Sequence, residues 1–211
     1  WEFPGGKVHA QESAVQALAR ELEEEVWIRV QSARPFLRTR HAYADRQVLL
    51  DVWRITSYLG SPHGREGQPV QWTPLEQLGR YDLPQADIPI LRALLLPNLY
   101  LISDAQRLGE ALFLERLERV LRAGVRLVQL REKHMASGAY LDLARRVVGL
   151  AHAYDAKVLL NADPAWVAKC GADGVHLSSQ RLFAARERPL PRALLVAASC
   201  HNAGELAHAE R

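Results

Sequence analysis

Apolar residues between positions 15 and 26 recur at intervals of three or four, the spacing that gathers side chains on one face of a helix. These residues are Val15, Leu18, Leu22 and Val26. Ser13 comes before the stripe, and Gln16 comes three positions after Ser13, which is the arrangement of a capping box. The pattern therefore predicts a helix that begins after Ser13 and buries one apolar stripe.

The first half of the chain continues with strand and turn patterns before a second helix. Residues 48–55 are rich in β-branched and aromatic side chains, which predicts a strand. Residues 60–69 contain several Gly and Pro residues and are predicted to form a loop. Residues 88–96 are predicted to form a closing helix that Pro97 stops, and we place a domain boundary there.

After Pro97 the pattern changes to alternating strands and helices. Apolar runs typical of buried parallel strands occupy residues 99–103, 127–130, 157–161, 174–177 and 194–199. Helical stretches separate them, for example residues 112–123 and 140–153. This alternation predicts an α/β domain with a parallel sheet, whose strand ends carry the active-site residues. The polar residues at these ends are Gln129, Arg131, Lys133, Asn161, Asp163, His176, Ser199 and His201.

Composition narrows the class of protein without selecting one. The 211 residues suffice for two domains of about 100 residues each, with 48% hydrophobic and 24% charged residues. The net charge of +3 is not gathered in a block, so we expect no direct binding to nucleic acid. The apolar run 90–96 is too short to cross a membrane and contains Arg92. Cys170 and Cys200 fit a reducing compartment, so we expect a cytoplasmic protein.

The predicted first helix carries three acids, Glu21, Glu24 and Glu25, on one face. Like charges at this spacing repel each other, and the helix dipole disfavours anions near a C-terminus. A hard cation such as Mg²⁺ would remove both costs, because carboxylate oxygens are its preferred ligands. The alternative is a solvated acidic face, which is the commoner meaning of a run of acids.

The turn and spacing around these acids resemble the Nudix box. The matching residues are Gly6, Glu12, Arg20, Glu21, Leu22, Glu24, Glu25 and Ile28. The preceding residues 1–7 are similar to the entry of that box in MutT-type enzymes, which hydrolyse oxidised guanine nucleotides such as 8-oxo-dGTP, and the resemblance covers residues 1–96. Trp27 stands where the family has a glycine with a left-handed backbone, so we expect a stability defect of about 1 kcal/mol.

The Nudix resemblance implies a metal site and a nucleotide site. It implies Mg²⁺, with Mn²⁺ as an alternative, held by Gly5, Glu21, Glu24, Glu25 and Glu66, of which the four acids are also the catalytic residues. It implies nucleotide contacts from Glu2, Phe3, Pro4, Gly5, Lys7, Tyr43, Arg46 and Asp87. Asp87 replaces a purine-reading Asn, and an ionised carboxylate only accepts hydrogen bonds, so the base preference stays open. Asp87 as a helix N-cap is the other interpretation.

The second half resembles the thiamine-phosphate synthase and thiazole tautomerase family. The resemblance rests on residues 128–133, 160–161, 171–176 and 199–201. It implies a barrel ligand, such as a thiamine-related phosphate, contacted by Gln129, Arg131, Lys133, Asn161 and His201. In the family, His201 matches the acid/base His of the tautomerase. Ala162 and Arg181 stand where the synthase has its two Mg²⁺ carboxylates, which argues against synthase chemistry.

These interpretations combine into one expected organisation. We expect a two-domain α/β chain, with a partial Nudix α/β/α sandwich over residues 1–96 that lacks its N-terminal strands. The first five βα units of a (β/α)₈ TIM barrel would follow over residues 97–211, with the C-terminal part of the barrel missing. The expected activity is Mg²⁺-dependent hydrolysis of oxidised purine nucleoside triphosphates to monophosphate and pyrophosphate, for nucleotide-pool sanitation and DNA repair. Alternatives are a thiamine-precursor enzyme or a non-catalytic barrel that regulates the hydrolase.

Overall fold

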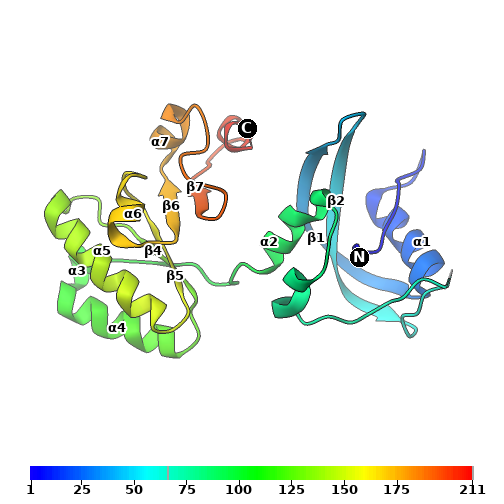
Figure 1. Cartoon of the computed structure of the whole chain (residues 1–211), viewed down its shortest axis with the longest axis horizontal. Coiled ribbons are helices and arrows are strands. Elements are labelled where there is room, and N and C mark those ends of the chain that lie inside the picture. The colour runs from blue at the N-terminus through cyan, green and yellow to red at the C-terminus, as the bar shows by residue number, and fades with distance from the viewer. Residues whose placement is uncertain (66, 211) are drawn as a thin grey trace. The chain divides into compact units, whose positions relative to one another are not determined.

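The computed structural model describes residues 1–65 and 67–210. The chain forms two compact units, Trp1–Leu96 and Pro97–Arg211, and each is described separately (Figure 1). Both units combine helices with strands. The expected mixed α/β class is therefore confirmed.

The first helix of unit 1, α1 (Ala14–Val26), begins where its sequence pattern predicts, but the predicted apolar stripe is buried only in part, because Val15 is exposed and Leu18 is half-buried. The N–H of Gln16 donates to Oγ of Ser13 at 3.3 Å, and Oε1 of Gln16 accepts from the N–H of Ser13 at 2.8 Å. The predicted capping box is thus confirmed. Leu22 and Val26 are buried in a small cluster that also includes Ile28.

A long antiparallel hairpin lies beside α1 and closes this cluster. Its strands are β1 (Arg29–Ala42) and β2 (Gln47–Leu59), and the N–H of Tyr43 donates to the carbonyl of Arg46 at the turn between them. The described residues of the segment 60–69 form no helix or strand, as predicted. The remaining elements of unit 1 are the 3₁₀ helices η1 (Leu75–Arg80) and η2 (Gln85–Asp87) and the helix α2 (Ile88–Leu94).

Unit 2 is built on a five-stranded parallel sheet in the order β3-β4-β5-β6-β7. The strands are β3 (Leu101–Ile102), β4 (Leu127–Leu130), β5 (Lys157–Leu160), β6 (Gly174–Leu177) and β7 (Leu195–Ala198). The helices are α3 (Ala105–Leu108), α4 (Glu110–Arg122), α5 (Ser137–His152), α6 (Trp166–Cys170), α7 (Ser179–Ala184) and α8 (Ala203–Ala209). All five predicted strands are present, although β3 is shorter than expected.

The core of unit 2 lies between the sheet and the helices that follow each strand. Val128 and Val158 in neighbouring strands are fully buried, and so are Leu143 and Val147 on the inner face of α5. Strands covered in this way read as short continuous apolar runs, which is why the sequence pattern located them. Because the strands are parallel, their carboxyl ends emerge at a common edge.

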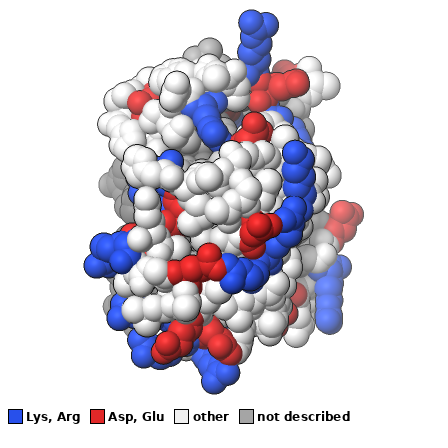
Figure 2. All heavy atoms as spheres, turned by 90° about the vertical axis from the view of Figure 1, so that its left-hand side faces the viewer, with Lys and Arg blue, Asp and Glu red and all other residues white. Residues whose placement is uncertain are grey.

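The surface carries charges of both signs side by side. On the face shown in Figure 2, Lys and Arg side chains alternate with Asp and Glu side chains. The small net charge therefore does not gather into one large basic patch on this face. Within the described residues, no helix has the length and apolar character that a membrane span needs.

Candidate functional site

Two consecutive glycines form a turn that lies against the acidic face of α1. The N–H of Gly5, whose φ is +148°, donates to Oε2 of Glu25 at 3.2 Å. A Cβ on Gly6 would lie 2.1 Å from the carboxyl carbon of Glu21, so any other residue at position 6 would displace this carboxylate from its observed place. The glycines therefore let the backbone approach two of the three predicted acids closely.

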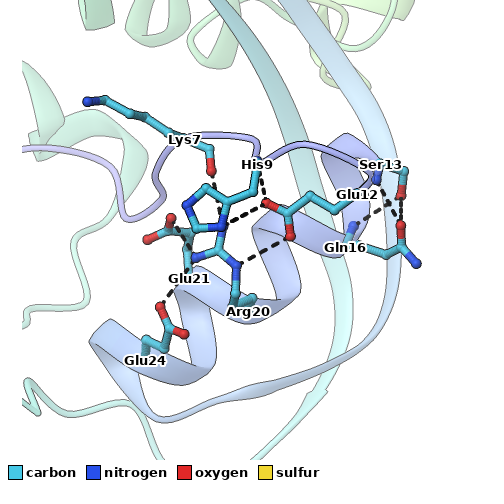
Figure 3. A network of polar contacts seen from close by, with 8 residues as sticks. All are labelled: Lys7, His9, Glu12, Ser13, Gln16, Arg20, Glu21 and Glu24. Carbon is cyan, nitrogen blue, oxygen red and sulfur yellow. Dashed lines mark hydrogen bonds and ion pairs between the residues drawn. The ribbon is translucent and has the colours of Figure 1, made fainter.

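Arg20 is the centre of the polar network at this turn (Figure 3). Its guanidinium donates to both oxygens of Glu12, at 2.8 and 3.3 Å, and to the carbonyl of Lys7 at 3.0 Å. One nitrogen, Nη1, also donates to Glu21 at 2.9 Å and to Glu24 at 3.3 Å. Through these contacts Arg20 supports two of the three acids, Glu21 and Glu24.

The network keeps Glu12 and Arg20 charged over a wide pH range. The hydrogen bonds from Arg20 and from the N–H of His9 lower the pKa of Glu12 to about 2. The hydrogen bonds that Arg20 donates to Glu12 and Glu21 raise the pKa of Arg20 above its usual value. Glu12 is thus a fixed anion that ties the turn to the middle of α1.

The acids fit a hard divalent cation in their chemistry. Glu21 and Glu24 converge on one nitrogen of Arg20, and Glu25 faces the adjacent glycine turn. Carboxylate and carbonyl oxygens are the ligands that Mg²⁺ prefers. Among residues 1–65 and 67–210, no group of three or more His, Cys, Asp and Glu has a ligating arrangement. Glu66, the fourth predicted acid, lies outside the described residues.

The predicted base-reading residue Asp87 lies beside the N-terminal segment. Its carboxylate accepts a hydrogen bond from the backbone of Phe3. Burial raises the pKa of Asp87, and the nearby charge of Glu2 raises it further, against the lowering effect of the bond from Phe3. Asp87 holds the N-cap position of α2, but its side chain makes no capping hydrogen bond there. The structure therefore brings three predicted nucleotide residues together.

The other predicted nucleotide residues lie on different elements. Tyr43 and Arg46 stack at the hairpin turn, with the guanidinium carbon 5.1 Å from the ring centroid. Lys7 and Pro4 lie in the segment that contains the glycine turn, and both are exposed. In Figure 3 the carbonyl of Lys7 faces Arg20 while its amino group extends away from the network.

In unit 2, the ends of β3 and β4 border a cleft of about 410 Å³. Arg131 and Lys133, two predicted ligand residues, line it. Between them, the buried Glu132 accepts hydrogen bonds from Oγ of Ser103 at 2.5 Å and from the N–H groups of Ala105 and Gln106 at 2.9 and 3.0 Å. Glu132 therefore fixes the β3–α3 turn beside two cations, a role that its sequence position does not reveal.

A chain of hydrogen bonds crosses the sheet at the strand ends. Nε2 of Gln129 donates to the hydroxyl of Tyr100 at 3.3 Å, and that hydroxyl lies 3.1 Å from Nδ1 of His176. Nε2 of His176 lies 3.0 Å from Oγ of Ser199, and Asn161 donates to the carbonyl of His176 at 2.8 Å. Burial, followed by the charge of Arg131, lowers the pKa of His176.

Two predicted ligand residues are therefore connected to His176: Asn161 directly, and Gln129 through the hydroxyl of Tyr100. The predicted His201 is exposed and is not one of the described residues that form this hydrogen-bond chain. Its backbone N–H donates to Oε2 of Glu205 at 2.6 Å. The sequence pattern predicts His176 at a strand end, but neither the pattern nor the family resemblance gives it a role. The alternation of side chains along β6 could have predicted its position, because every second side chain of a strand lies on the same face.

The chain is thus a two-unit α/β protein. Its first unit has an acidic helix beside a glycine turn, and its second unit has a polar cleft with charges of both signs at the ends of parallel strands. Residues 1–93 match the family described as NUDIX domain, and residues 99–211, more than half of the chain, match the family described as thiamine monophosphate synthase. The chain therefore belongs to both families, with a Nudix domain followed by a thiamine-phosphate synthase-like domain.

Relatives of both halves support this membership. The 8-oxo-dGTP diphosphatase of Escherichia coli K12 is 40% identical over 93 residues, which cover 44% of this chain and 72% of that protein. The CTP pyrophosphohydrolase of the same strain is 37% identical over 93 residues, which cover 44% and 69%. The putative thiamine-phosphate synthase 2 of Aquifex aeolicus is 37% identical over 116 residues, which cover 55% of this chain and 62% of that protein. The chain thus spans less than two thirds of this synthase relative.

Proposed function

We propose that unit 1 is a Mg²⁺-dependent hydrolase of nucleoside triphosphates that releases monophosphate and pyrophosphate. The observation that carries the proposal is the set of Glu21, Glu24 and Glu25 gathered around Arg20 and the glycine turn. Carboxylate oxygens grouped in this way are the ligands that a hard divalent cation prefers, which favours a metal-binding role. The similarity to diphosphatases of the Nudix family points in the same direction.

Each group of residues has a proposed role. Glu21, Glu24, Glu25 and Glu66, with the carbonyl of Gly5, would hold Mg²⁺ or, alternatively, Mn²⁺. Such an ion neutralises phosphate charge and lowers the pKa of a bound water. Glu2, Phe3, Pro4, Gly5, Lys7, Tyr43, Arg46 and Asp87 would contact the nucleotide. Arg20 and Glu12 hold the acids and the turn in place.

Oxidised guanine nucleotides such as 8-oxo-dGTP are the first candidate substrates, which implies a role in nucleotide-pool sanitation. Cytosine nucleotides are a second candidate, because an ionised Asp87 accepts from an exocyclic amino group such as that of cytosine. One of the similar proteins is a CTP pyrophosphohydrolase. Protonated Asp87 would both donate and accept, as an Asn does, and burial favours that form.

A nucleotide panel tests this function directly. We expect the chain to release pyrophosphate from 8-oxo-dGTP or CTP faster than from unmodified dGTP, and only when Mg²⁺ or Mn²⁺ is present. The Asp87→Asn variant should shift the ratio of kcat/KM toward 8-oxo-dGTP. Turnover of no nucleoside triphosphate in the panel, or turnover that a chelator leaves unchanged, contradicts the proposal.

For unit 2 we propose binding of an anionic thiamine-related phosphate in the cleft beside Arg131 and Lys133. Arg131 and Lys133 favour a phosphate group, because the two carboxylates of the same cleft have other partners. Asp104 pairs with Arg107, and Glu132 accepts from the β3–α3 turn.

Thiamine-phosphate formation is not proposed, because Ala162 is buried and Arg181 is a cation where the synthase needs carboxylates. Proton-transfer chemistry through His201 is the alternative, since it needs no metal.

A further inference from the structure

Trp27 stands at the end of α1, where the family pattern has a glycine. Its backbone is left-handed, with φ 57° and ψ 36°, and its N–H donates to the carbonyl of Leu22. A Cβ makes this conformation unfavourable. The left-handed backbone predicted for this position is confirmed. Contacts of the indole ring must therefore offset the conformational cost of a side chain at this position.

The ring of Trp27 has partners in the loop after β2, of which residues 61–65, 67 and 68 are described. The guanidinium carbon of Arg65 lies 4.2 Å from the ring centroid, which is within cation–π range. The imidazole of His63 lies 6.1 Å from the same ring. Because 48% of Trp27 is exposed, the ring supports the loop from the side and is not part of the core.

Hydrogen bonds attach the same loop to the last turn of α1. The N–H of His63 donates to the carbonyl of Val26 at 3.1 Å, and the N–H of Arg65 donates to the carbonyl of Glu25, also at 3.1 Å. The side-chain amide of Gln68 donates to the carbonyl of Glu25 at 3.0 Å. These carbonyls lack partners within the helix, so the loop satisfies its end.

Glu25 connects this loop to the proposed metal site. Its carbonyl accepts from the loop, while its carboxylate accepts from the N–H of Gly5. A cation beside the helix C-terminus also offsets the unfavourable charge of the acids there. Any displacement of the loop therefore changes the surroundings of an acid that faces the glycine turn.

We propose that Trp27 is a positioning residue that holds Arg65, and with it the described residues of this loop, against the end of α1, and thereby raises the affinity of the site for divalent metal. The inference rests on the proposed function, because the site is the proposed metal site. It replaces the view of Trp27 as a mere stability defect, since the contact of the ring with Arg65 offsets the strain of the left-handed backbone.

Trp27→Gly in the full chain is the principal test, because glycine keeps the left-handed backbone and removes only the ring. We expect amide hydrogen exchange at His63 and Arg65 to accelerate by about tenfold, as local opening becomes easier. The Mg²⁺ dissociation constant, measured by calorimetry, should rise by about three- to tenfold. The melting temperature should stay close to that of the wild type.

Three further variants control this test. Trp27→Phe retains an aromatic ring and should behave as the wild type, whereas Arg65→Gln removes the cation and should reproduce the glycine variant. Trp72→Gly removes a more exposed indole that stacks on Tyr58, and it should change neither measurement. If Trp27→Gly does not fold, Arg65→Gln carries the test.

The outcomes separate this inference from the proposed function. Unchanged exchange at both amides, or unchanged Mg²⁺ affinity, in Trp27→Gly and Arg65→Gln overturns the role of Trp27. A wild-type chain that binds no divalent metal and hydrolyses no nucleoside triphosphate contradicts the proposed function instead. In that case exchange at His63 and Arg65 still decides whether the ring holds the loop.

Discussion

At the scale of single residues, Glu25 has the most direct expected effect on hydrolysis. Glu25→Gln should lower kcat by about two or more orders of magnitude and weaken Mg²⁺ binding, because it removes a proposed ligand charge beside the glycine turn. Glu23→Gln is the matched control, because the Glu23 carboxylate makes an ion pair with Arg29, with 3.3 Å between Oε1 and Nη2, and not with the glycine turn. Steady-state kinetics against Mg²⁺ concentration provide the measurement. A near-normal kcat in Glu25→Gln refutes the assignment of Glu25 as a metal ligand.

The second prediction concerns Asp87 and the dependence of the melting temperature on pH. Burial raises its folded pKa above the ordinary value of 3.8, so the folded state binds the proton more tightly than the unfolded state. The protonated Asp87 therefore stabilises the folded state fully when the pH is below 3.8, and this stabilisation is lost as the pH rises through the folded pKa. Asp87→Asn cannot lose a proton, so its melting temperature should gain on that of the wild type as pH increases from about 4 to 7. A constant difference over this range contradicts the shift.

At the scale of elements, the capping box of α1 can be tested without touching the acids. Ser13→Ala should lower the free energy of unfolding by about 1 kcal/mol, because it leaves the N–H of Gln16 without its acceptor. Urea denaturation monitored by circular dichroism measures the change. Gln16→Ala should cost less, since it leaves the cap oxygen of Ser13 in place. Equal and negligible effects of both substitutions contradict a stabilising role for the box.

The elements also show what a sequence pattern can and cannot predict. The capping box and the buried strands β4 to β6 were predictable because they depend on residues close together in the sequence. The pairing of Arg20 with Glu12 could not be derived from helical spacing, because it spans the turn before the helix. The hydrogen bonds of Glu132 to the β3–α3 turn likewise join residues that only the folded sheet brings together. Long-range polar partners therefore account for much of what the sequence could not provide.

At the scale of the whole molecule, the two units have separate proposed functions. We expect no thiamine-phosphate formation from pyrimidine diphosphate and thiazole phosphate, since Ala162 and Arg181 supply no metal carboxylates. Calorimetry should nevertheless detect weak binding of thiazole phosphate, and Arg131→Ala should weaken it by about 1.5–3 kcal/mol, the worth of a charge-assisted contact. Metal-dependent synthesis of thiamine phosphate would refute the first expectation. Unaltered affinity in Arg131→Ala would refute the second.

The guanidinium of Arg20 has a consequence for how the first domain matures. It already supplies a positive charge to Glu12, Glu21 and Glu24, so the polypeptide carries its own counter-ion before any metal arrives. Folding therefore does not have to wait for metal loading, in contrast to small domains that remain unstructured until their ion binds. If the proposed Mg²⁺ requirement holds, the domain would stay folded but inactive without Mg²⁺ and would become active when Mg²⁺ is added.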